Sequence, residues 1–414
     1  MILFGHQTGN PNAHHAALAH YEAGRLEAFV VPWFPSHAAL SVLHRIPALR
    51  AMAGRLKRRR FEPLAAAPKI QGPLAEFKRL AMRACGKGHE GLSYEINDWL
   101  MRTMAQASHR PAVTAVHSYE DACLWSFQEA KKQGKACIYD MPIGYYPWWQ
   151  DKQAQLANQF SEWLPRGGLP SNRWARPEQK RQEMELADLV LVPSSFVEKS
   201  IRQFVDKNIA LAPYGVDLQF WKPADNQRLA ASDEQDSPLA ARDSRLNFVF
   251  AGQLSIRKGI PILLEAWKKA ELNDATLTLV GSWQLAEARK KTLPSHCIYR
   301  GHVSREGLRD LFHKSDVFVF PTYFEGRALV AIEAMACALP ILTTEASGVT
   351  DLIDQTSGRS FETGSVDSLV DSLRWFAANR HKLPAMRVAA RQKAETCTWE
   401  NYRHCVSGAV APFV

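Results

Sequence analysis

Two glutamates in the C-terminal half, Glu325 and Glu333, have the spacing and surroundings of ligand-binding carboxylates. The apolar run 317–321 predicts a buried strand, and a loop through Gly326 leads into a helix that begins near residue 328 or 329. Glu325 then precedes the helix, and Glu333 lies about one turn inside it. Because the first turn of a helix has free N–H groups and the positive end of the helix dipole, a phosphate fits between these two carboxylates.

Two adjacent cations, Arg257 and Lys258, lie in the sequence GQLSIRKG, residues 252–259, between a predicted strand and a helix. Arginine binds phosphate through paired hydrogen bonds and lysine acts as a point charge, so the two can neutralise a diphosphate leaving group without a metal. The sequence has no Asp-x-Asp motif that would indicate a metal-held diphosphate. A nucleoside-diphosphate sugar presents sugar hydroxyls, a diphosphate and ribose hydroxyls in that order, which matches the two carboxylates and two cations.

The elements that position these residues alternate between short apolar runs and longer amphipathic stretches, the pattern of parallel sheets covered by helices. Two doubly wound domains that face each other place the carboxyl ends of their strands at one cleft. We predict domains at 1–221 and 245–397, a linker or surface excursion at 222–244, and a C-terminal helix at 398–414 that crosses back to the first domain. Strands are predicted at 2–4, 28–34, 113–117, 136–140, 188–192, 209–212, 246–251, 276–280, 297–300, 316–321 and 339–344.

Composition limits the class of protein. The chain has 414 residues, 46% hydrophobic and 22% charged, which allows two or three globular domains. It has no apolar run of the roughly 18 residues that a membrane-spanning helix needs, and its first ten residues predict a strand rather than a signal peptide. We therefore expect a cytoplasmic protein. Seven scattered cysteines without CxxC spacing predict reduced thiols, and the net charge of +9 favours an anionic partner.

Three segments in the expected order carry a family resemblance. The sequence EGRALVAIE, residues 325–333, resembles the Glu-x7-Glu motif of retaining glycosyltransferase family 4, and GQLSIRKG resembles the phosphate loop of that family. PYGVDLQFW, residues 213–221, resembles the segment that closes its first domain. The resemblance implies an α/β fold of the GT-B type, an activated sugar donor, and metal-independent transfer with no cofactor and with retained anomeric configuration.

The resemblance also implies roles for individual residues. By position, Glu325 would hold donor-sugar hydroxyls, Glu333 the ribose, and Arg257 and Lys258 the diphosphate. The backbone after Glu325 would touch sugar and phosphate. The donor-binding set is thus Gly252, Arg257, Lys258, Val303, Glu325, Gly326, Arg327, Ala328, Leu329 and Glu333, with Val303 beside the nucleobase. The chain departs from the family at Arg327 and Ala328, where a Gly-rich continuation is usual, and Arg327 either adds a phosphate contact or faces solvent.

Residues of the first domain are expected to bind the acceptor. His117 ends a predicted strand, where similar enzymes place a histidine over the reacting sugar, and histidine can exchange protons near neutral pH. The catalytic set is therefore His117, Glu325, Arg257 and Lys258. The Gly- and Asn-containing loop at 5–17 and the aromatic run at 138–149 supply the other acceptor candidates, although a turn and a packed core are alternatives. The acceptor-binding set is Asn12, His14, His117, Tyr145 and Trp148.

The segment 44–61 interleaves Leu, Ile and Met with arginines and ends in a basic run. Such a stretch predicts contact with an anionic membrane surface, with a solvated helix face as the alternative. The combined prediction is a hexosyltransferase that moves sugar from a nucleotide sugar to a glycan or lipid-linked acceptor in surface polysaccharide biosynthesis, on the inner face of the membrane. Alternatives are a sugar phosphorylase, a nucleotide-sugar epimerase, a silent sugar-nucleotide sensor, and a nucleic-acid-binding protein. No nucleic acid is expected, because the cations are dispersed.

Overall fold

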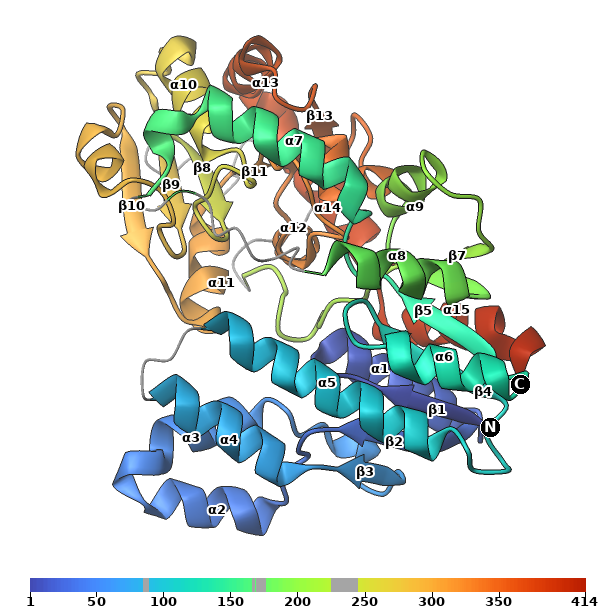
Figure 1. Ribbon diagram of the computed structural model, residues 1–414. Coiled ribbons are helices and arrows are strands. Elements are labelled where there is room, and N and C mark those ends of the chain that lie inside the picture. Colours follow the sequence, from blue (N-terminus) through green and yellow to red (C-terminus); the bar gives the residue numbers. More distant parts are fainter. Residues whose placement is uncertain (85–88, 166–167, 169–175, 225–244) are drawn as a thin grey trace.

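The protein folds into two α/β lobes, each built around a parallel sheet with helices on both faces (Figure 1). The computed structural model describes residues 1–84, 89–165, 168, 176–224 and 245–414. The predicted linker at 222–244 lies outside the described residues from position 225 onward. The prediction of two doubly wound domains is confirmed.

The sheet of the first lobe has seven strands in the order β3-β2-β1-β4-β5-β6-β7, and every neighbouring pair is parallel. Its central strands are buried on both faces, which explains why they appear in the sequence as continuous apolar runs. The strands are β1 (Ile2–Gly5), β2 (Leu26–Val31), β3 (Lys69–Gln71), β4 (Ala115–Tyr119), β5 (Ala136–Asp140), β6 (Leu189–Val192) and β7 (Ile209–Leu211).

Nine α-helices are described in the first lobe, and most of them cover its sheet (Figure 1). They are α1 (Pro11–Glu22), α2 (His37–Arg45), α3 (Arg50–Lys57), α4 (Pro73–Ala84), α5 (His89–Ala107), α6 (Leu124–Lys132), α7 (Tyr146–Gln159), α8 (Pro177–Leu186) and α9 (Ser195–Arg202). Side-chain caps begin several of them: Asn10 accepts from the Ala13 N–H at α1, and Ser194 accepts from the Val197 N–H at α9.

The sheet of the second lobe has the order β10-β9-β8-β11-β12-β13 and is also parallel. Its strands are β8 (Leu246–Ala251), β9 (Ala275–Val280), β10 (Cys297–Gly301), β11 (Val317–Phe320), β12 (Ile341–Thr343) and β13 (Gly358–Ser360). The helices are α10 (Ile260–Ala270), α11 (Arg305–Lys314), α12 (Leu329–Ala336), α13 (Val366–Ala378) and α14 (Leu383–Glu395), and the chain ends in α15 (Trp399–Val410), which packs on the first lobe.

Strands β3 and β13 were not predicted from the sequence. Both are three-residue edge strands, KIQ and GRS, and neither has an apolar run that alternates or continues long enough to indicate a strand. They form because a neighbouring strand supplies hydrogen-bond partners, β2 for β3 and β12 for β13. Their existence is therefore decided by the sheet and not by local sequence.

Two connections hold the lobes together. Helix α15 packs on α1, where the Trp399 ring stacks on His15 with a centroid distance of 4.4 Å. The backbone at Gly215 passes so close to this crossing that a Cβ there would lie 2.3 Å from the Trp399 nitrogen. Helix α7 extends from the first lobe across the second (Figure 1). Beyond its end, the Trp163 carbonyl accepts a hydrogen bond of 2.9 Å from the Ala286 N–H.

Two further sequence predictions concern the membrane and the thiols. Within the described ranges, none of the helices combines the length and the apolarity required to span a membrane. The described cysteines are all free thiols, at Cys123, Cys137, Cys297, Cys337, Cys397 and Cys405.

Candidate functional site

The centre of the candidate site is the carboxylate of Glu325, on which three side chains converge. Its Oε1 lies 2.7 Å from Nη1 of Arg257 and 2.5 Å from Nζ of Lys258, and it accepts a hydrogen bond of 3.1 Å from the Thr322 hydroxyl. The side chains of the three charged residues are only 11–16% exposed. The residues come from two loops that follow β8 and β11, which are neighbours in the sheet, so the topology brings them together.

The two loops are fixed against each other by a glycine. Gly259 has a φ of +72°, and a Cβ at this position would lie 1.9 Å from the carbonyl oxygen of Pro321. Only glycine combines this backbone conformation with such a close approach. The Tyr323 N–H donates to the Arg257 carbonyl at 2.9 Å, which adds a second tie between the loops.

The charges around Glu325 determine its protonation. Burial alone would raise the pKa of the Glu325 carboxyl, but Lys258 and Arg257 lower it by a larger amount, so the pKa lies below its usual value. Glu325 is therefore an anion at neutral pH. An incoming diphosphate is a second anion for the same two cations, and it would release the Glu325 carboxylate to accept hydrogen bonds from sugar hydroxyls.

Helix α12 starts beside this cluster. Its N-cap, Ala328, donates its N–H to the Ser347 carbonyl at 3.0 Å, whereas the N–H groups of Leu329 and Val330 have no acceptor among the described residues. Both residues are partly exposed. The helix end therefore offers free donors and a positive dipole for a phosphate oxygen.

Glu333 lies one turn inside α12 in an apolar setting. Burial raises the pKa of its carboxyl to about 7, although the Arg305 cation and the Trp221 indole N–H lower it in part. Trp221 is almost completely buried and contacts the ring of Phe312. The segment 213–221 thus ends at Trp221, close enough to Glu333 to influence its pKa.

The loop after Glu325 also contacts the first lobe. The Gly326 carbonyl accepts a hydrogen bond of 2.5 Å from the Ser194 hydroxyl, and a Cβ on Gly326 would lie 1.8 Å from the Pro142 carbonyl oxygen. The Gly144 N–H donates to the Glu325 carbonyl at 3.3 Å. Ser194 was not among the predicted site residues, although its place two residues after β6 is a signal that could have indicated it.

Arg327 does not have the expected surroundings. Its side chain is only 1% exposed and is paired with Asp351 at 2.9 Å, and the same Nη1 donates to the Gly348 carbonyl at 3.2 Å. A third acceptor, at 3.4 Å, is the Pro193 carbonyl of the first lobe. The guanidinium therefore faces neither phosphate nor solvent, because these buried acceptors hold it at the contact between the lobes.

His117 also requires a correction. Strand β4 continues to Tyr119, so His117 lies inside the strand with no exposed surface. Its Nδ1 is 2.9 Å from Nε2 of His20, and its ring packs on Phe4. Burial lowers its pKa to about 3. Because this side chain is fully buried against Phe4 and His20, we do not retain it as a catalytic residue.

Most of the other acceptor candidates are buried. Asn12 and His14 lie on the inner face of α1, and the His14 ring stacks on Phe61 at 5.3 Å. Tyr145 is the N-cap of α7 and packs against Tyr146. The packing explanation therefore fits these three side chains. Trp148 differs, because it is partly exposed and lines a pocket between the lobes.

Two donor candidates remain, both in loops that follow strands of the second lobe. Gly252 directly follows β8 and has a φ of +151°, and its carbonyl oxygen lies 1.8 Å from where a Cβ of Gly281 would be. These two glycines allow the ends of β8 and β9 to approach closely. Val303 follows β10 and is half-buried against the core of the lobe.

Comparisons with known proteins agree with this geometry. Residues 231–394 match the family model described as "Glycosyl transferases group 1". The chain is 26% identical over 225 residues to a sulfoquinovosyl transferase of Arabidopsis thaliana. This match covers 51% of this chain and 42% of that protein. It is 25% identical over 242 residues to a lipopolysaccharide 1,2-N-acetylglucosaminetransferase of Salmonella typhimurium. This match covers 53% of this chain and 61% of that protein. The chain spans about half the length of the curated relatives it matches.

The likeness to solved structures extends over the whole chain. HepE of Anabaena in complex with UDP superposes with a TM-score of 0.61 at 15% identity, covering 99% of both chains. A sucrose-phosphate synthase of Thermosynechococcus elongatus gives the same TM-score at 17% identity, covering 97% of this chain and 96% of the other. The two parallel α/β lobes and these structural neighbours show a GT-B fold. In this GT-B protein the cluster at Glu325 and the start of α12 lie within the group 1 match.

Proposed function

We propose that the protein is a retaining, metal-independent hexosyltransferase of family 4 that uses a nucleotide-diphosphate sugar. The observation that carries this proposal is the convergence of Arg257 and Lys258 on the Glu325 carboxylate, next to the free N–H groups that begin α12. Within the described residues, no group of three His, Cys, Asp or Glu side chains is arranged as metal ligands. The support for metal independence is the presence of two cations and a helix N-terminus where the diphosphate charge would develop.

In the proposed step, an acceptor hydroxyl attacks the anomeric carbon and the bond from that carbon to the diphosphate oxygen breaks. Arg257, Lys258 and the N–H groups of Leu329 and Val330 stabilise the charge on the departing diphosphate. Glu325 positions the sugar through its hydroxyls, and Glu333 accepts hydrogen bonds from the ribose. The proton of the acceptor hydroxyl passes to the departing diphosphate, so the proposal needs no protein base and no role for His117.

The first experiment is a thermal-shift screen of UDP-, GDP- and ADP-sugars, because a ligand that binds the folded state raises the apparent melting temperature. HepE is solved with UDP and with UDP-glucose, which makes UDP-sugars the first choice. A nucleotide sugar that raises the melting temperature is then tested for transfer with glycan and lipid-linked acceptors. Conversion of the donor without any acceptor would indicate an epimerase, and a requirement for inorganic phosphate would indicate a phosphorylase.

The pKa of Glu333 predicts how donor binding depends on pH. Below about 7 the buried carboxyl is mostly the neutral acid, and above about 7 it is the carboxylate that accepts hydrogen bonds from both ribose hydroxyls. The affinity for UDP-glucose is therefore expected to rise as the pH increases through about 7 and then to level off. UDP-glucose suits the measurement because it has no terminal phosphate. A terminal phosphate titrates near pH 6 and would add its own pH dependence to the affinity.

Titration calorimetry across a pH series checks this expectation. The Glu333→Gln variant, which cannot ionise, should bind more weakly at high pH and show a flat profile through the same range. A wild-type profile that is equally flat would show that Glu333 does not bind the ribose.

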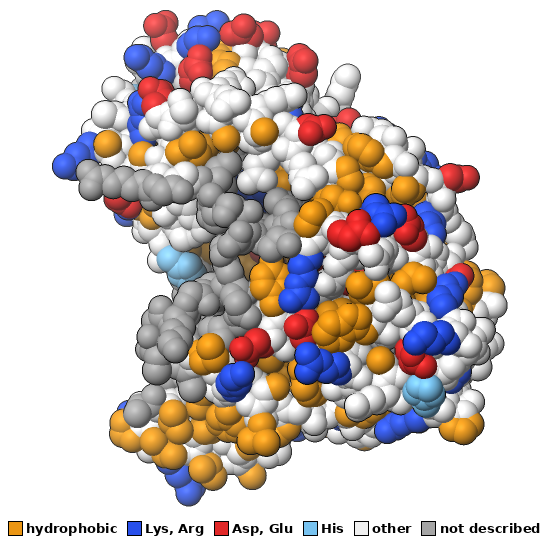
Figure 2. Space-filling model, viewed as in Figure 1, with side chains coloured by type: hydrophobic (Ala, Val, Ile, Leu, Met, Phe, Trp, Pro, Cys, Tyr) orange, Lys and Arg blue, Asp and Glu red, His pale blue; other side chains and the backbone are white. Residues whose placement is uncertain are grey.

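We propose that the acceptor is a glycan or a lipid-linked glycan of surface polysaccharide biosynthesis, reached at an anionic membrane surface. An exposed apolar patch on α2 and α4 supports this. Val42, Ile46, Leu74 and Phe77 are 57%, 43%, 83% and 40% exposed, and Figure 2 shows hydrophobic side chains gathered at this lower edge of the molecule. Basic residues follow on α2 and α3, among them Arg45 and Arg50. Apolar side chains flanked by cations fit the boundary of anionic lipid headgroups and acyl chains.

Replacing both Leu74 and Phe77 by aspartate is expected to abolish sedimentation with vesicles that contain anionic lipid. Neither residue is buried, although the Phe77 ring contacts Trp33 at 4.9 Å, so the melting temperature of the double variant should fall only slightly. The matched control is Leu211→Asp, because Leu211 is also 44% exposed but lies on the edge strand β7. Equal vesicle binding by the double variant and the wild type would rule out this surface as the membrane contact.

A further inference from the structure

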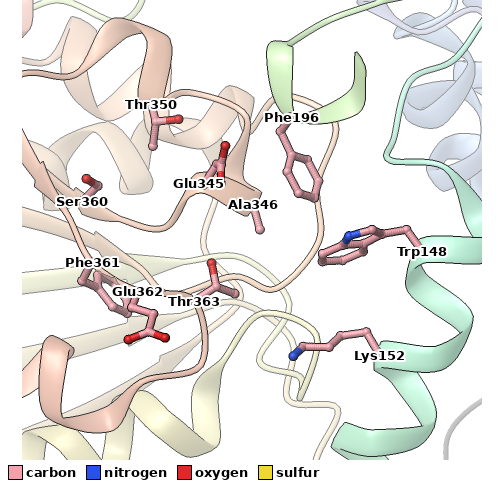
Figure 3. A pocket seen from close by; sticks show the side chains of 10 residues that line it. All are labelled: Trp148, Lys152, Phe196, Glu345, Ala346, Thr350, Ser360, Phe361, Glu362 and Thr363. Atoms are coloured by element: carbon pink, nitrogen blue, oxygen red, sulfur yellow. The ribbon is translucent and has the colours of Figure 1, made fainter. Parts of the chain in front are cut away.

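A pocket with a volume of about 590 Å³ lies between the two lobes, beside helix α7 (Figure 3). Its volume falls within the range of about 300–1,000 Å³ that is typical of small-molecule sites. The first lobe contributes residues from α7 and α9, and the second lobe contributes residues from the loops that follow β12 and β13. The lining consists of Trp148, Lys152, Phe196, Glu345, Ala346, Thr350, Ser360, Phe361, Glu362 and Thr363.

The pocket is separate from the proposed donor site. Of all the residues assigned to donor or acceptor from the sequence, only Trp148 lines it. Ser347, in the loop after β12, bonds through its carbonyl to Ala328 at the start of α12, while its neighbours Glu345 and Ala346 line the pocket. This loop therefore lies between the helix end that would hold phosphate and the pocket.

The lining combines aromatic rings with many hydrogen-bonding groups. Trp148, Phe196 and Phe361 supply apolar surface, and the rings of Trp148 and Phe196 meet edge to face at 5.4 Å. Thr350, Ser360 and Thr363 each supply a hydroxyl that can donate and accept. A sugar ring has apolar C–H faces and a rim of hydroxyls. The aromatic rings of the pocket can pack on the faces, and its hydroxyls can form hydrogen bonds with the rim.

The charges favour a neutral ligand. Two carboxylates, Glu345 and Glu362, line the pocket with one ammonium, that of Lys152. Figure 3 shows the Lys152 amine extending from α7 toward the loop of Thr363. Glu345 also pairs with Lys199, outside the lining. With Glu345 paired to Lys199, the lining leaves no surplus of positive charge for a phosphate or uronate, whereas sugar hydroxyls can donate to the carboxylates and accept from the ammonium.

We propose that this pocket binds a neutral saccharide unit, as a subsite distinct from the donor site. Assigning that unit to the acceptor glycan rests on the proposed function, whereas saccharide binding itself does not. The Trp148 ring, which lines the pocket, stacks on Phe324 at 5.6 Å, and Phe324 directly precedes Glu325. A saccharide in the pocket thus contacts both lobes and a ring that packs on the loop of Glu325, so it should favour this arrangement of the lobes and tighten donor binding.

The test uses maltotriose and N,N′-diacetylchitobiose as neutral probes and trigalacturonate as an anionic probe. Binding to the full chain is measured by saturation-transfer NMR and titration calorimetry. At least one neutral probe should bind, and trigalacturonate should bind more weakly. The Ser360→Trp variant fills the pocket and should weaken binding of that neutral probe at least tenfold, a loss of about 1.4 kcal/mol. Its affinity for UDP-glucose without saccharide should stay unchanged.

Controls separate pocket filling from other effects. Gln355→Trp places the same bulk on an exposed turn outside the lining and should leave saccharide binding unchanged. Glu362→Gln and Lys152→Ala alter lining side chains without adding volume, and each should weaken binding with little effect on melting temperature. Glu265→Gln, on the exposed face of α10, is the matched control for the glutamate change.

The outcomes are distinguishable from those of the proposed function. Absence of binding by both neutral probes, binding that the Ser360, Glu362 and Lys152 variants leave intact, or preference for trigalacturonate would each overturn the subsite. Saccharide binding that is lost in Ser360→Trp, in a protein that binds no nucleotide sugar, would retain the subsite and reject the proposed function. Nucleotide-sugar transfer without saccharide binding in the pocket would retain the proposed function and reject the subsite.

Discussion

Replacing Lys258 by alanine is expected to reduce kcat for sugar transfer about 100- to 1,000-fold, the usual cost of removing one preorganised group that stabilises transition-state charge. The Nζ of Lys258 lies 2.5 Å from Glu325, in a side chain that is 11% exposed, so no nearby water can replace it fully. The affinity for UDP should also fall, since the ammonium meets the diphosphate in the ground state as well. Steady-state kinetics with the donor found by the thermal-shift screen, together with calorimetry of UDP, measures both effects.

Lys268→Ala is the matched control for this substitution, because Lys268 is an exposed lysine near the end of α10, the helix that follows the same loop. It should leave transfer unchanged. Circular dichroism and the melting temperature of Lys258→Ala should stay close to those of the wild type, because Arg257 still pairs with Glu325. An unchanged transfer rate in Lys258→Ala, with verified donor and acceptor, would remove this lysine from the mechanism.

Replacing Glu325 by glutamine is expected to separate transfer from nucleotide binding. Loss of a charged hydrogen-bond acceptor for the sugar should lower kcat/KM about 10- to 100-fold, since hydrogen bonds to charged groups contribute about 1.5–3 kcal/mol. The affinity for UDP, which has no sugar, should stay the same or rise. The reason is that Arg257 and Lys258 both contact Oε1 of Glu325 in the absence of ligand, and a neutral amide no longer competes with the diphosphate for them.

This prediction is opposite in sign to that for Lys258, which makes the pair informative. Lys258→Ala should weaken UDP binding, whereas Glu325→Gln should not. Glu287→Gln, an exposed glutamate of the second lobe, provides the control and should change neither quantity. Weaker UDP binding in Glu325→Gln than in the wild type would show that this carboxylate holds the cations in place instead of competing with the phosphate.

The cluster at Glu325 was predictable because it combines two pairs of residues, each of which is local in sequence. Arg257 and Lys258 are adjacent, and Glu325 and Glu333 are eight positions apart across one loop and one helix turn, so local geometry sets most of their arrangement. The two loops follow apolar strands that are neighbours in a parallel sheet, a topology that the alternation of strands and helices predicts. The same reasoning did not extend to the first lobe, where the candidates were single residues in loose contexts.

Periodicity in the sequence was enough to predict two doubly wound domains, and local motifs were enough to predict that Arg257, Lys258 and Glu325 lie in loops after neighbouring strands. Tertiary structure decided which polar side chains reach the cleft. His117 lies against Phe4 and His20, and Arg327 lies against Asp351, because burial depends on partners distant in sequence. It also decided that α7 crosses to the second lobe and that a pocket forms beneath it. No local sequence pattern predicts which side chains are buried, where α7 lies or where the pocket forms. Each of these features depends on how separate elements pack together.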